Sequence, residues 1–184
     1  MRERFVAMTS RSAFLDALAC SRRSSELDHV DDLFGFLIGS WDIDATIHGA
    51  DGQVRRTRGE VHASWVLEGR AIQDLFIFPR PADRTSGGSA PGDRYATTIR
   101  TYDRERAAWR VLFINPAAVE TNAELTARRN GQAIAMEGHL ADRTPIRWRY
   151  EDVTEKSFHY SAHRLSGDGR TWQMYLEIFG RRVG

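Results

Sequence analysis

The sequence predicts an all-β protein: a closed, antiparallel, up-and-down barrel of about ten strands, preceded by one or two short N-terminal helices. Three observations predict this class. Apolar residues alternate with period two from residue 40 onward, turn residues recur at regular intervals, and a sheet of this size leaves costly unpaired edges unless it closes. The 184 residues, 41% of them hydrophobic, suffice for one domain with a substantial core.

The chain divides into a short N-terminal segment and one barrel domain. Residues 1–24 are rich in arginine and serine, so we expect a loosely structured segment with a short amphipathic helix near Ser12–Cys20. The barrel domain is predicted to span residues 25–184.

A second helix is predicted directly before the first strand. Ser25 and Asp28 form a start that resembles a capping box. Apolar residues then follow at helical spacing: Leu27, Val30, Phe34 and Leu37. We expect this helix to end at Gly39, where the period of the apolar residues changes to two.

Period-two alternation marks the strands, and Gly, Asn and Asp residues mark the turns between them. The predicted strands are 40–48, 54–66, 70–78, 94–102, 107–115, 119–128, 132–140, 144–154, 157–165 and 170–180. The longest interruption, at 79–93, is rich in Pro, Gly and Ser and predicts a mobile loop.

Two turns, at 68–69 and 130–131, predict which side chains share the inner face. If each is a two-residue turn, apolar residues meet apolar residues across the hairpin. The predicted partners are Trp65 and Ile72, Ala63 and Asp74, Val61 and Phe76, Ala127 and Ile134, Leu125 and Met136, and Ala123 and Gly138. A slip of one residue would move every apolar side chain to the outer face, so the turns support one another.

Two later turns, at 155–156 and 167–168, predict the inner face of the last three strands in the same way. The predicted partners are Leu165 and Ile146, His163 and Trp148, Ser161 and Tyr150, and His159 and Asp152, with Trp172, Met174 and Leu176 beside His163, Ser161 and His159. This register places two histidines and a carboxylate inside the barrel.

The predicted interior combines large apolar side chains with a few polar ones. Its apolar members are Trp41, Trp65, Phe76, Phe78, Phe113, Trp148, Trp172 and Met174, and its polar members are Asp74, Tyr95, Asn115, Tyr150, Asp152, His159, Ser161 and His163. Buried polar groups need partners, so a polar cluster in an apolar cavity is a candidate recognition site. The ligand-contacting residues predicted from this pattern are Trp65, Asp74, Phe76, Tyr95, Phe113, Asn115, Trp148, Tyr150, Ser161, Trp172 and Met174.

His159, His163 and Asp152 are the candidate catalytic residues if the protein is an enzyme. Asp152 opposite His159 would orient and tune its imidazole as a general base. The alternative is that each histidine is a structural residue near the rim of the barrel. A shared metal ion is not expected, because four residues of strand separate the two histidines by about 13 Å at ~3.3 Å per residue.

The junction Gly39-Ser40-Trp41 resembles the Gly-X-Trp signature of the calycin superfamily, which includes the lipocalins and the fatty-acid-binding proteins. The hairpin around Trp65 and Gly69, and Tyr102-Asp103 followed by Trp109, extend the likeness to small bacterial lipocalin-like families of unassigned function. The resemblance implies that Trp41 closes one end of the barrel. It also implies a cation–π contact between Trp41 and an arginine after the last strand, Arg181 or Arg182.

Composition argues against several classes of partner. The formal charge of +1 gives no bulk attraction to nucleic acid, and no apolar run approaches the ~20 residues of a membrane span. The single cysteine, Cys20, fits a reducing compartment, so we expect a cytoplasmic protein. No cofactor is predicted.

The sequence is compatible with three functions. The first is a barrel that binds a small hydrophobic or aromatic molecule in its interior. The second is a cofactor-independent cyclase, isomerase or lyase of small-metabolite biosynthesis that uses a histidine in the cavity. The third is an interaction module with a filled barrel, for which an apolar surface on the helix at 26–38 would pair two copies of the chain as a homodimer.

Overall fold

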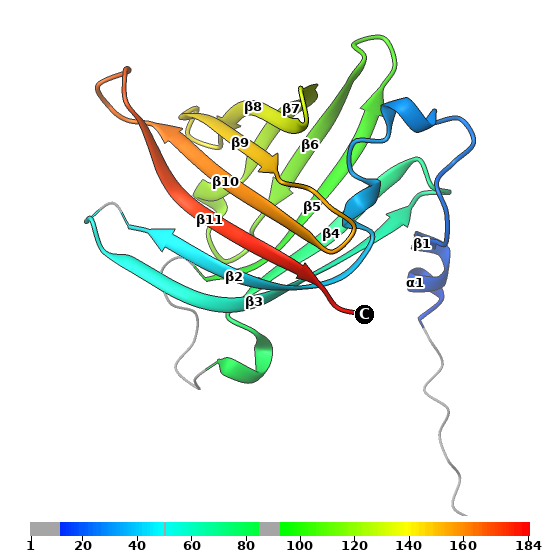
Figure 1. Ribbon diagram of the computed structural model, residues 1–184, viewed down its shortest axis with the longest axis horizontal. Helices are drawn as coiled ribbons and strands as arrows, with labels where there is room; N and C mark the ends of the chain where they lie inside the picture. Colours follow the sequence, from blue (N-terminus) through cyan, green and yellow to red (C-terminus); the bar gives the residue numbers. More distant parts are fainter. Residues whose placement is uncertain (1–11, 50, 85–92) are drawn as a thin grey trace, which may run out of the picture.

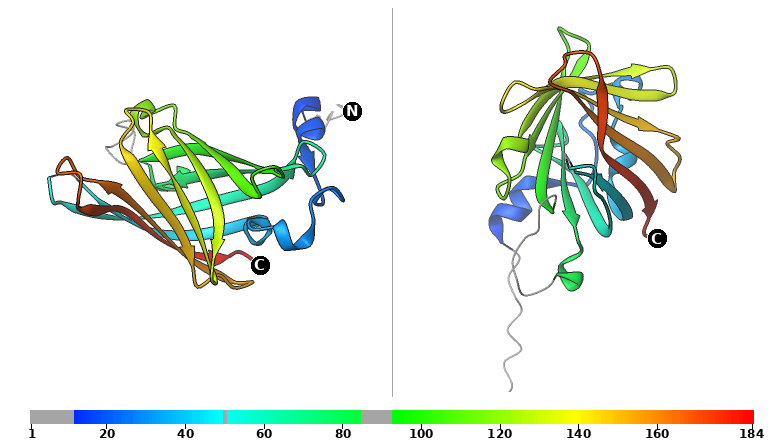
Figure 2. Two further views of the ribbon diagram at one scale, coloured as in Figure 1. Left: turned by 90° about the horizontal axis from the view of Figure 1, so that it is seen from above. Right: turned by 90° about the vertical axis from the view of Figure 1, so that its left-hand side faces the viewer.

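Ten antiparallel strands form the barrel in the computed structural model, which describes residues 12–49, 51–84 and 93–184 (Figures 1 and 2). The strands are β2 (Gly39–His48), β3 (Val54–Val66), β4 (Ala71–Phe78), β5 (Arg94–Asp103), β6 (Ala108–Ile114), β7 (Ala123–Asn130), β8 (Ala133–Leu140), β9 (Pro145–Glu151), β10 (Ser157–Leu165) and β11 (Trp172–Arg182). Each strand pairs with the next, β11 pairs with β2, and the β3–β4 pairing completes the ring. The closed up-and-down barrel predicted from the sequence is confirmed.

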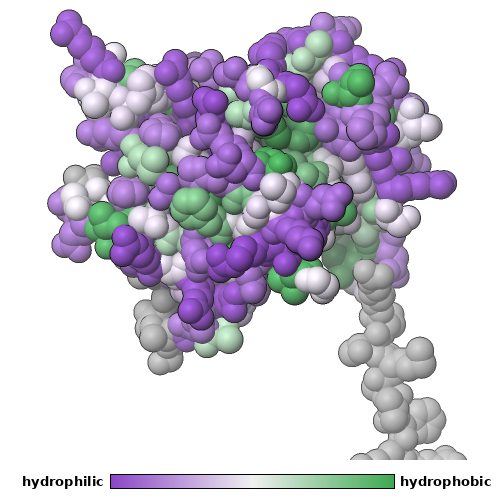
Figure 3. Space-filling view, viewed as in Figure 1, coloured by the Kyte–Doolittle hydropathy of each residue, from purple (hydrophilic) through white to green (hydrophobic). Residues whose placement is uncertain are grey.

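Alternation along each strand separates an apolar interior from a polar exterior. In β2, for example, Trp41, Ile43 and Ala45 are buried, while the residues between them are partly exposed. Ion pairs link neighbouring strands on the outside, among them Arg147 to Glu137 at 3.1 Å. The face seen in Figure 3 is accordingly mostly hydrophilic, with hydrophobic side chains visible between the charged ones.

The N-terminal segment contributes a short helix and an eleventh strand. The helix α1 (Ala13–Leu18) lies within the range predicted for it. The strand β1 (Ala19–Cys20) pairs with the end of β3, so that Cys20 lies opposite Trp65. Residues 1–11, which belong to the segment expected to be loosely structured, lie outside the described residues. No helix in the described ranges is long and apolar enough to cross a membrane.

The prediction of one continuous helix over 25–38 is wrong. The segment forms two separate 3₁₀ turns, η1 (His29–Asp31) and η2 (Gly35–Leu37). The Asp32 side chain accepts the backbone N–H of Gly35 at 2.7 Å, a local bond that competes with helical hydrogen bonding. Leu27, Phe34 and Leu37 are buried as expected, but Val30 is 77% exposed and takes no part in the packing.

Trp41 and Arg182 close the end of the barrel that η2 covers. The guanidinium carbon of Arg182 lies 4.1 Å from the centroid of the fully buried Trp41 ring, which confirms the predicted cation–π contact. Arg182 also donates hydrogen bonds to the carbonyls of Phe36 at 2.5 Å, Ile38 at 2.6 Å and Glu155 at 2.6 Å. One side chain therefore joins the N-terminal turns, the plug and the β9–β10 loop.

The two earlier registers keep the predicted faces. In the β3–β4 hairpin Trp65 lies opposite Ile72, as expected. In the β7–β8 hairpin the pairing is displaced by two residues, so that Ala127 lies opposite Met136 instead of Ile134. A shift of two leaves each side chain on its own face of the sheet, and the apolar residues stay inside.

The predicted β9–β10 register is wrong by one residue. Asp152 is exposed and adopts a positive φ of 49°, and residues 152–156 form a loop longer than the predicted two-residue turn. Consequently His159 pairs with Glu151, and Tyr160 pairs with Tyr150. An odd displacement exchanges the two faces of β10, so the residues expected inside lie outside.

A β-bulge in β11 alters the alternation once more. His163 pairs with Met174 and Ala162 pairs with Leu176, which leaves Tyr175 as the extra residue between them. Tyr175 and Leu176 both contact the interior cavity as a result.

Two connections lie at the end of the barrel opposite Trp41. The 3₁₀ turn η4 (Val119–Thr121) occupies the first part of the predicted 119–128 strand, and β7 begins only at Ala123. The predicted 79–93 loop contains η3 (Pro81–Asp83), and its residues 85–92 lie outside the described residues.

Replacement of Arg182 by lysine should lower the free energy of unfolding by about 2 kcal/mol, because lysine keeps the charge but cannot bond three separated carbonyls. Urea denaturation followed by tryptophan fluorescence measures this loss. The control is Arg181→Lys, since Arg181 makes an exposed ion pair with Asp44 at 2.7 Å, and its effect should stay below about 0.5 kcal/mol. Equal effects of the two substitutions would contradict the role assigned to Arg182.

Candidate functional site

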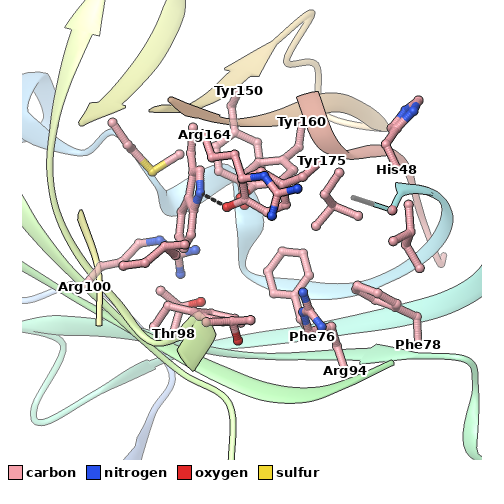
Figure 4. A pocket seen from close by; sticks show the side chains of 18 residues that line it. His48, Phe76, Phe78, Arg94, Thr98, Arg100, Tyr150, Tyr160, Arg164 and Tyr175 are labelled. Atoms are coloured by element: carbon pink, nitrogen blue, oxygen red, sulfur yellow. Dashed lines mark hydrogen bonds between the residues drawn. The ribbon is translucent and has the colours of Figure 1, made fainter. Parts of the chain in front are cut away.

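An interior cavity of about 260 Å³ occupies the half of the barrel away from Trp41. It is much larger than the ~10–15 Å³ that one water molecule requires. Its walls come from eight strands, the β2–β3 turn and η4, and Figure 4 shows the side chains that face it. The lining residues are Ile47, His48, Gly49, Phe76, Phe78, Arg94, Thr98, Arg100, Phe113, Thr121, Met136, Leu140, Trp148, Tyr150, Tyr160, Arg164, Tyr175 and Leu176.

Aromatic rings form much of the cavity wall. Trp148 meets Phe113 edge to face, with ring centroids 5.6 Å apart, and Tyr160 at 6.1 Å. Tyr160 in turn lies 5.0 Å from Tyr150 and 6.4 Å from Phe76. These contacts hold the rings in fixed orientations, so the wall is a rigid apolar surface suited to a planar guest.

The inner end of the cavity contains a buried ion pair. Asp74 on β4 bonds the guanidinium of Arg100 on β5, and its other oxygen accepts the backbone N–H of Thr98 at 3.2 Å. Arg100 also lies over the ring of Phe34, 4.9 Å from its centroid. Burial acts to lower the pKa of Arg100, but Asp74, Tyr150 and Tyr160 together raise that pKa above its ordinary value. Burial also raises the pKa of the Asp74 carboxyl, and the contacts with Arg100 and Thr98 oppose that rise. The direct contact between the two groups favours the ion pair. Arg100 is therefore a charged group whose charge is already compensated.

Three polar atoms of cavity-lining residues are buried without a hydrogen-bond partner among the described residues. They are Nε of Arg100, the hydroxyl of Tyr150 and Nε2 of His48. Burial raises the pKa of Tyr150 far above its ordinary value, so the hydroxyl keeps its proton at neutral pH. The Arg100 guanidinium acts on the Tyr150 hydroxyl and opposes this rise of its pKa, so the two groups lie near each other. Nε of Arg100 and the Tyr150 hydroxyl are thus two donors without an acceptor among the described residues.

A second polar group of the cavity is centred on the bulged residue Tyr175. Its hydroxyl accepts a hydrogen bond from Nε1 of Trp148 at 2.5 Å, shown as the dashed line in Figure 4. Burial raises the pKa of Tyr175 to about 12, while the Trp148 bond and the charges of Arg94 and Arg164 oppose that rise. Both arginines are thus close enough to act on the same hydroxyl.

Four of the predicted ligand-contacting residues line the cavity: Phe76, Phe113, Trp148 and Tyr150. Asp74 lies directly behind the wall and acts through Arg100. The cavity therefore brings together the central part of the predicted set, from β4, β6 and β9.

Three other predicted residues lie elsewhere. Trp65 is buried in the core without contacting the cavity. Asn115 is buried in the β6–β7 connection, where its backbone N–H bonds Asn122 and its side-chain amide bonds Thr121. Tyr95 was expected inside but is 50% exposed, and Arg84 lies over its ring at 5.1 Å.

The altered β10 register moves the candidate catalytic residues out of the barrel. His159 bonds Glu177 at 3.0 Å and stacks on the exposed Phe179, so its expected place in the cavity is wrong. His163 and Ser161 share the face of β10 that carries His159, where Ser161 is nonetheless only 5% exposed and does not contact the cavity. Asp152 is exposed in the loop. The predicted pairing of His159 with Asp152 is replaced by pairing with Glu151.

Trp172 and Met174 precede the bulge and lie on the outer face with His163. The guanidinium of Arg147, itself on the outside, lies 4.0 Å from the Trp172 ring centroid. Neither residue contacts the cavity, contrary to the expectation for the inner face.

The sequence pattern missed most of the polar lining: His48, Arg94, Thr98, Arg100, Tyr160, Arg164 and Tyr175. Tyr160 and Arg164 follow from the corrected β10 register. Arg100 had a usable signal, because a carboxylate predicted inside at Asp74 requires a basic partner on a neighbouring strand. Among the described residues there is no group of three or more His, Cys, Asp or Glu side chains placed to hold a metal ion.

No family model matches the chain, and no curated protein matches it in sequence. Among solved structures it is similar to the S-type phycobiliprotein lyase CPES from Guillardia theta, with a TM-score of 0.55, 13% identity, and 84% of this chain and 93% of that one covered. It is also similar to Rv2717c from M. tuberculosis, with a TM-score of 0.56, 14% identity, and 86% and 99% covered. The fold is calycin-like. At these identities the likeness extends to the fold alone.

Replacement of Asp74 by asparagine should lower the free energy of unfolding by about 3 kcal/mol, because it leaves the buried charge of Arg100 uncompensated. The matched control is Asp44→Asn, which removes one partner of an exposed pair and should change stability by about 0.5 kcal/mol or less. Denaturant titration of both variants measures the difference. A fully stable Asp74→Asn protein would mean that Arg100 is not held charged in the folded state.

Proposed function

We propose that the protein binds one small, largely apolar molecule with an aromatic core inside the barrel. The cavity is large enough for such a guest, and its rigid ring-lined wall offers the flat contacts that an aromatic molecule makes well. The cytoplasmic location expected from the sequence stays part of this proposal.

The observation that carries the proposal is the pair of unused donors at Arg100 and Tyr150. A buried donor without an acceptor costs about 1–3 kcal/mol, so folded proteins rarely retain one without a reason. An oxygen atom placed between Arg100 Nε and the Tyr150 hydroxyl would satisfy both donors. Because Asp74 already compensates Arg100, the favoured acceptor is neutral, such as a ketone or an ether oxygen.

The catalytic alternative has lost the geometry on which it depended. His159 and His163 lie outside the barrel, so neither of the two predicted histidines can act on a guest in the cavity. The similarity to a protein named as a lyase adds no argument for activity, since it extends to the fold alone. The filled-barrel alternative disagrees with the size of the cavity.

A bulky residue at the open end should block binding. We expect Leu140→Trp, at the end of β8, to weaken binding of 2-acetylnaphthalene at least about tenfold in isothermal titration calorimetry. The control, Leu112→Trp, adds the same ring on the outer face of β6, where Leu112 is 37% exposed, and should bind like the parent protein. Equal binding by all three proteins, or no binding by the parent, would contradict an interior site.

Removal of the Tyr150 hydroxyl should separate binding from stability. Tyr150→Phe deletes an unpartnered group, so its stability should be unchanged or slightly higher, while affinity for 2-acetylnaphthalene should fall about tenfold. Affinity for 2-isopropylnaphthalene, which has the same shape without the acceptor, should stay the same. A parallel loss for both compounds would show that Tyr150 contributes shape rather than a hydrogen bond.

A further inference from the structure

The charged side chains around the cavity indicate the charge of its ligand, which the apolar wall does not. Three arginines line it, Arg94, Arg100 and Arg164, and the described lining residues include no aspartate or glutamate. Asp74 compensates Arg100 from behind the wall.

The side chain of Arg164 makes no ion pair and no hydrogen bond within the described part of the chain. It is half-buried near the end of β10, and Figure 4 shows its guanidinium directed into the space between the aromatic rings. Arg164 lies on the cavity wall because the β9–β10 pairing is displaced by one residue from the predicted register, and the same displacement turns His163 outward. The chain thus directs an uncompensated cation into an aromatic cavity.

Arg94 lines the cavity from β5 and, like Arg164, makes no ion pair among the described residues. Among the described residues, its side chain makes one hydrogen bond, from Nη1 to the backbone carbonyl of Asp93 at 3.1 Å. The Asp93 carboxylate pairs with Arg55 at 2.8 Å. The exposed Glu120 on η4 acts on Arg94 without forming an ion pair with it. Burial lowers the pKa of Arg94, as expected for a cation that has lost water without gaining a counter-charge.

Tyr175 lies within electrostatic reach of both Arg94 and Arg164. Its hydroxyl oxygen is occupied by the Trp148 N–H, and its own proton has no acceptor among the described residues. All three residues line the cavity toward its open end, where β5 begins, β10 ends and β11 begins. A carboxylate is a planar acceptor whose two oxygens can bond one O–H donor and two guanidinium groups.

We infer that the ligand is an aromatic or apolar carboxylate whose charged group is bound by Arg94, Arg164 and the Tyr175 hydroxyl. This inference rests on the proposed function and adds the charge of the guest and its orientation. The anionic end lies toward the open end of the barrel, where β5 begins and β10 ends, and the apolar part extends toward Tyr150 and Arg100.

The test compares 2-naphthoate with 2-naphthamide, a neutral compound of almost the same shape. Calorimetric titration should give at least tenfold tighter binding of 2-naphthoate. Equal affinities would overturn the inference and leave the proposed function intact. Failure of both compounds, together with failure of 2-acetylnaphthalene, would instead overturn the proposed function.

Substitutions locate the charged group. Arg94→Gln, Arg164→Gln and Tyr175→Phe should each weaken 2-naphthoate about tenfold and change 2-naphthamide less than about twofold. Arg164→Lys, which retains the charge, should keep most of the preference, and this guards against a loss caused by altered packing. The control Arg147→Gln removes an arginine on the outer face and should leave both affinities unchanged. If none of the three cavity variants affects the preference, the carboxylate does not lie at this position and the inference is wrong.

Discussion

Closure of the sheet is the constraint on which the rest of the structure depends. Once β3 pairs with β2 and with β4, every side chain of the wall points either into one enclosed space or out to water. The outer face then accommodates cross-strand ion pairs such as Arg147 with Glu137, and the inner face must satisfy its few polar groups within the barrel. The buried Asp74–Arg100 pair, the Trp148–Tyr175 bond and the Arg182 contacts with the plug all meet that requirement.

Side chains of a strand alternate between the inside and the outside of the barrel. A register shift of an odd number of residues therefore exchanges the two faces, whereas an even shift leaves every side chain on its own face. The sequence was sufficient for the fold, the strand positions and the plug, since these depend on alternation and on local turn residues. An error of two residues in the β7–β8 hairpin was harmless, because Ala127 stays inside whichever partner it meets. An error of one in the β9–β10 hairpin exchanged His159 for Tyr160, and with it the predicted chemistry of the site.

The parts of the site that sequence reasoning missed depend on interactions that period-two patterns do not record. The loop at 152–156 and the bulge at Tyr175 each shift the inside–outside alternation of side chains by one residue. Neither has a distinctive local sequence signature. In β5 the more apolar phase, which includes Tyr95, faces outward, while the phase with Arg100 faces inward because Asp74 on β4 compensates its charge. That choice is made by a contact between residues 26 positions apart.

If the barrel binds a guest as proposed, its sealed end also limits how that guest is exchanged. Trp41, held under Arg182 and roofed by η2, leaves the opposite end as the route along the barrel axis. A rigid guest that fills the ring-lined space has no room to turn end over end, so the part that enters first leaves last. Its residence time is then governed by the side chains at the rim, whereas its equilibrium affinity also depends on the contacts made farther in. Substitutions at these two depths would therefore alter different kinetic steps of one binding event.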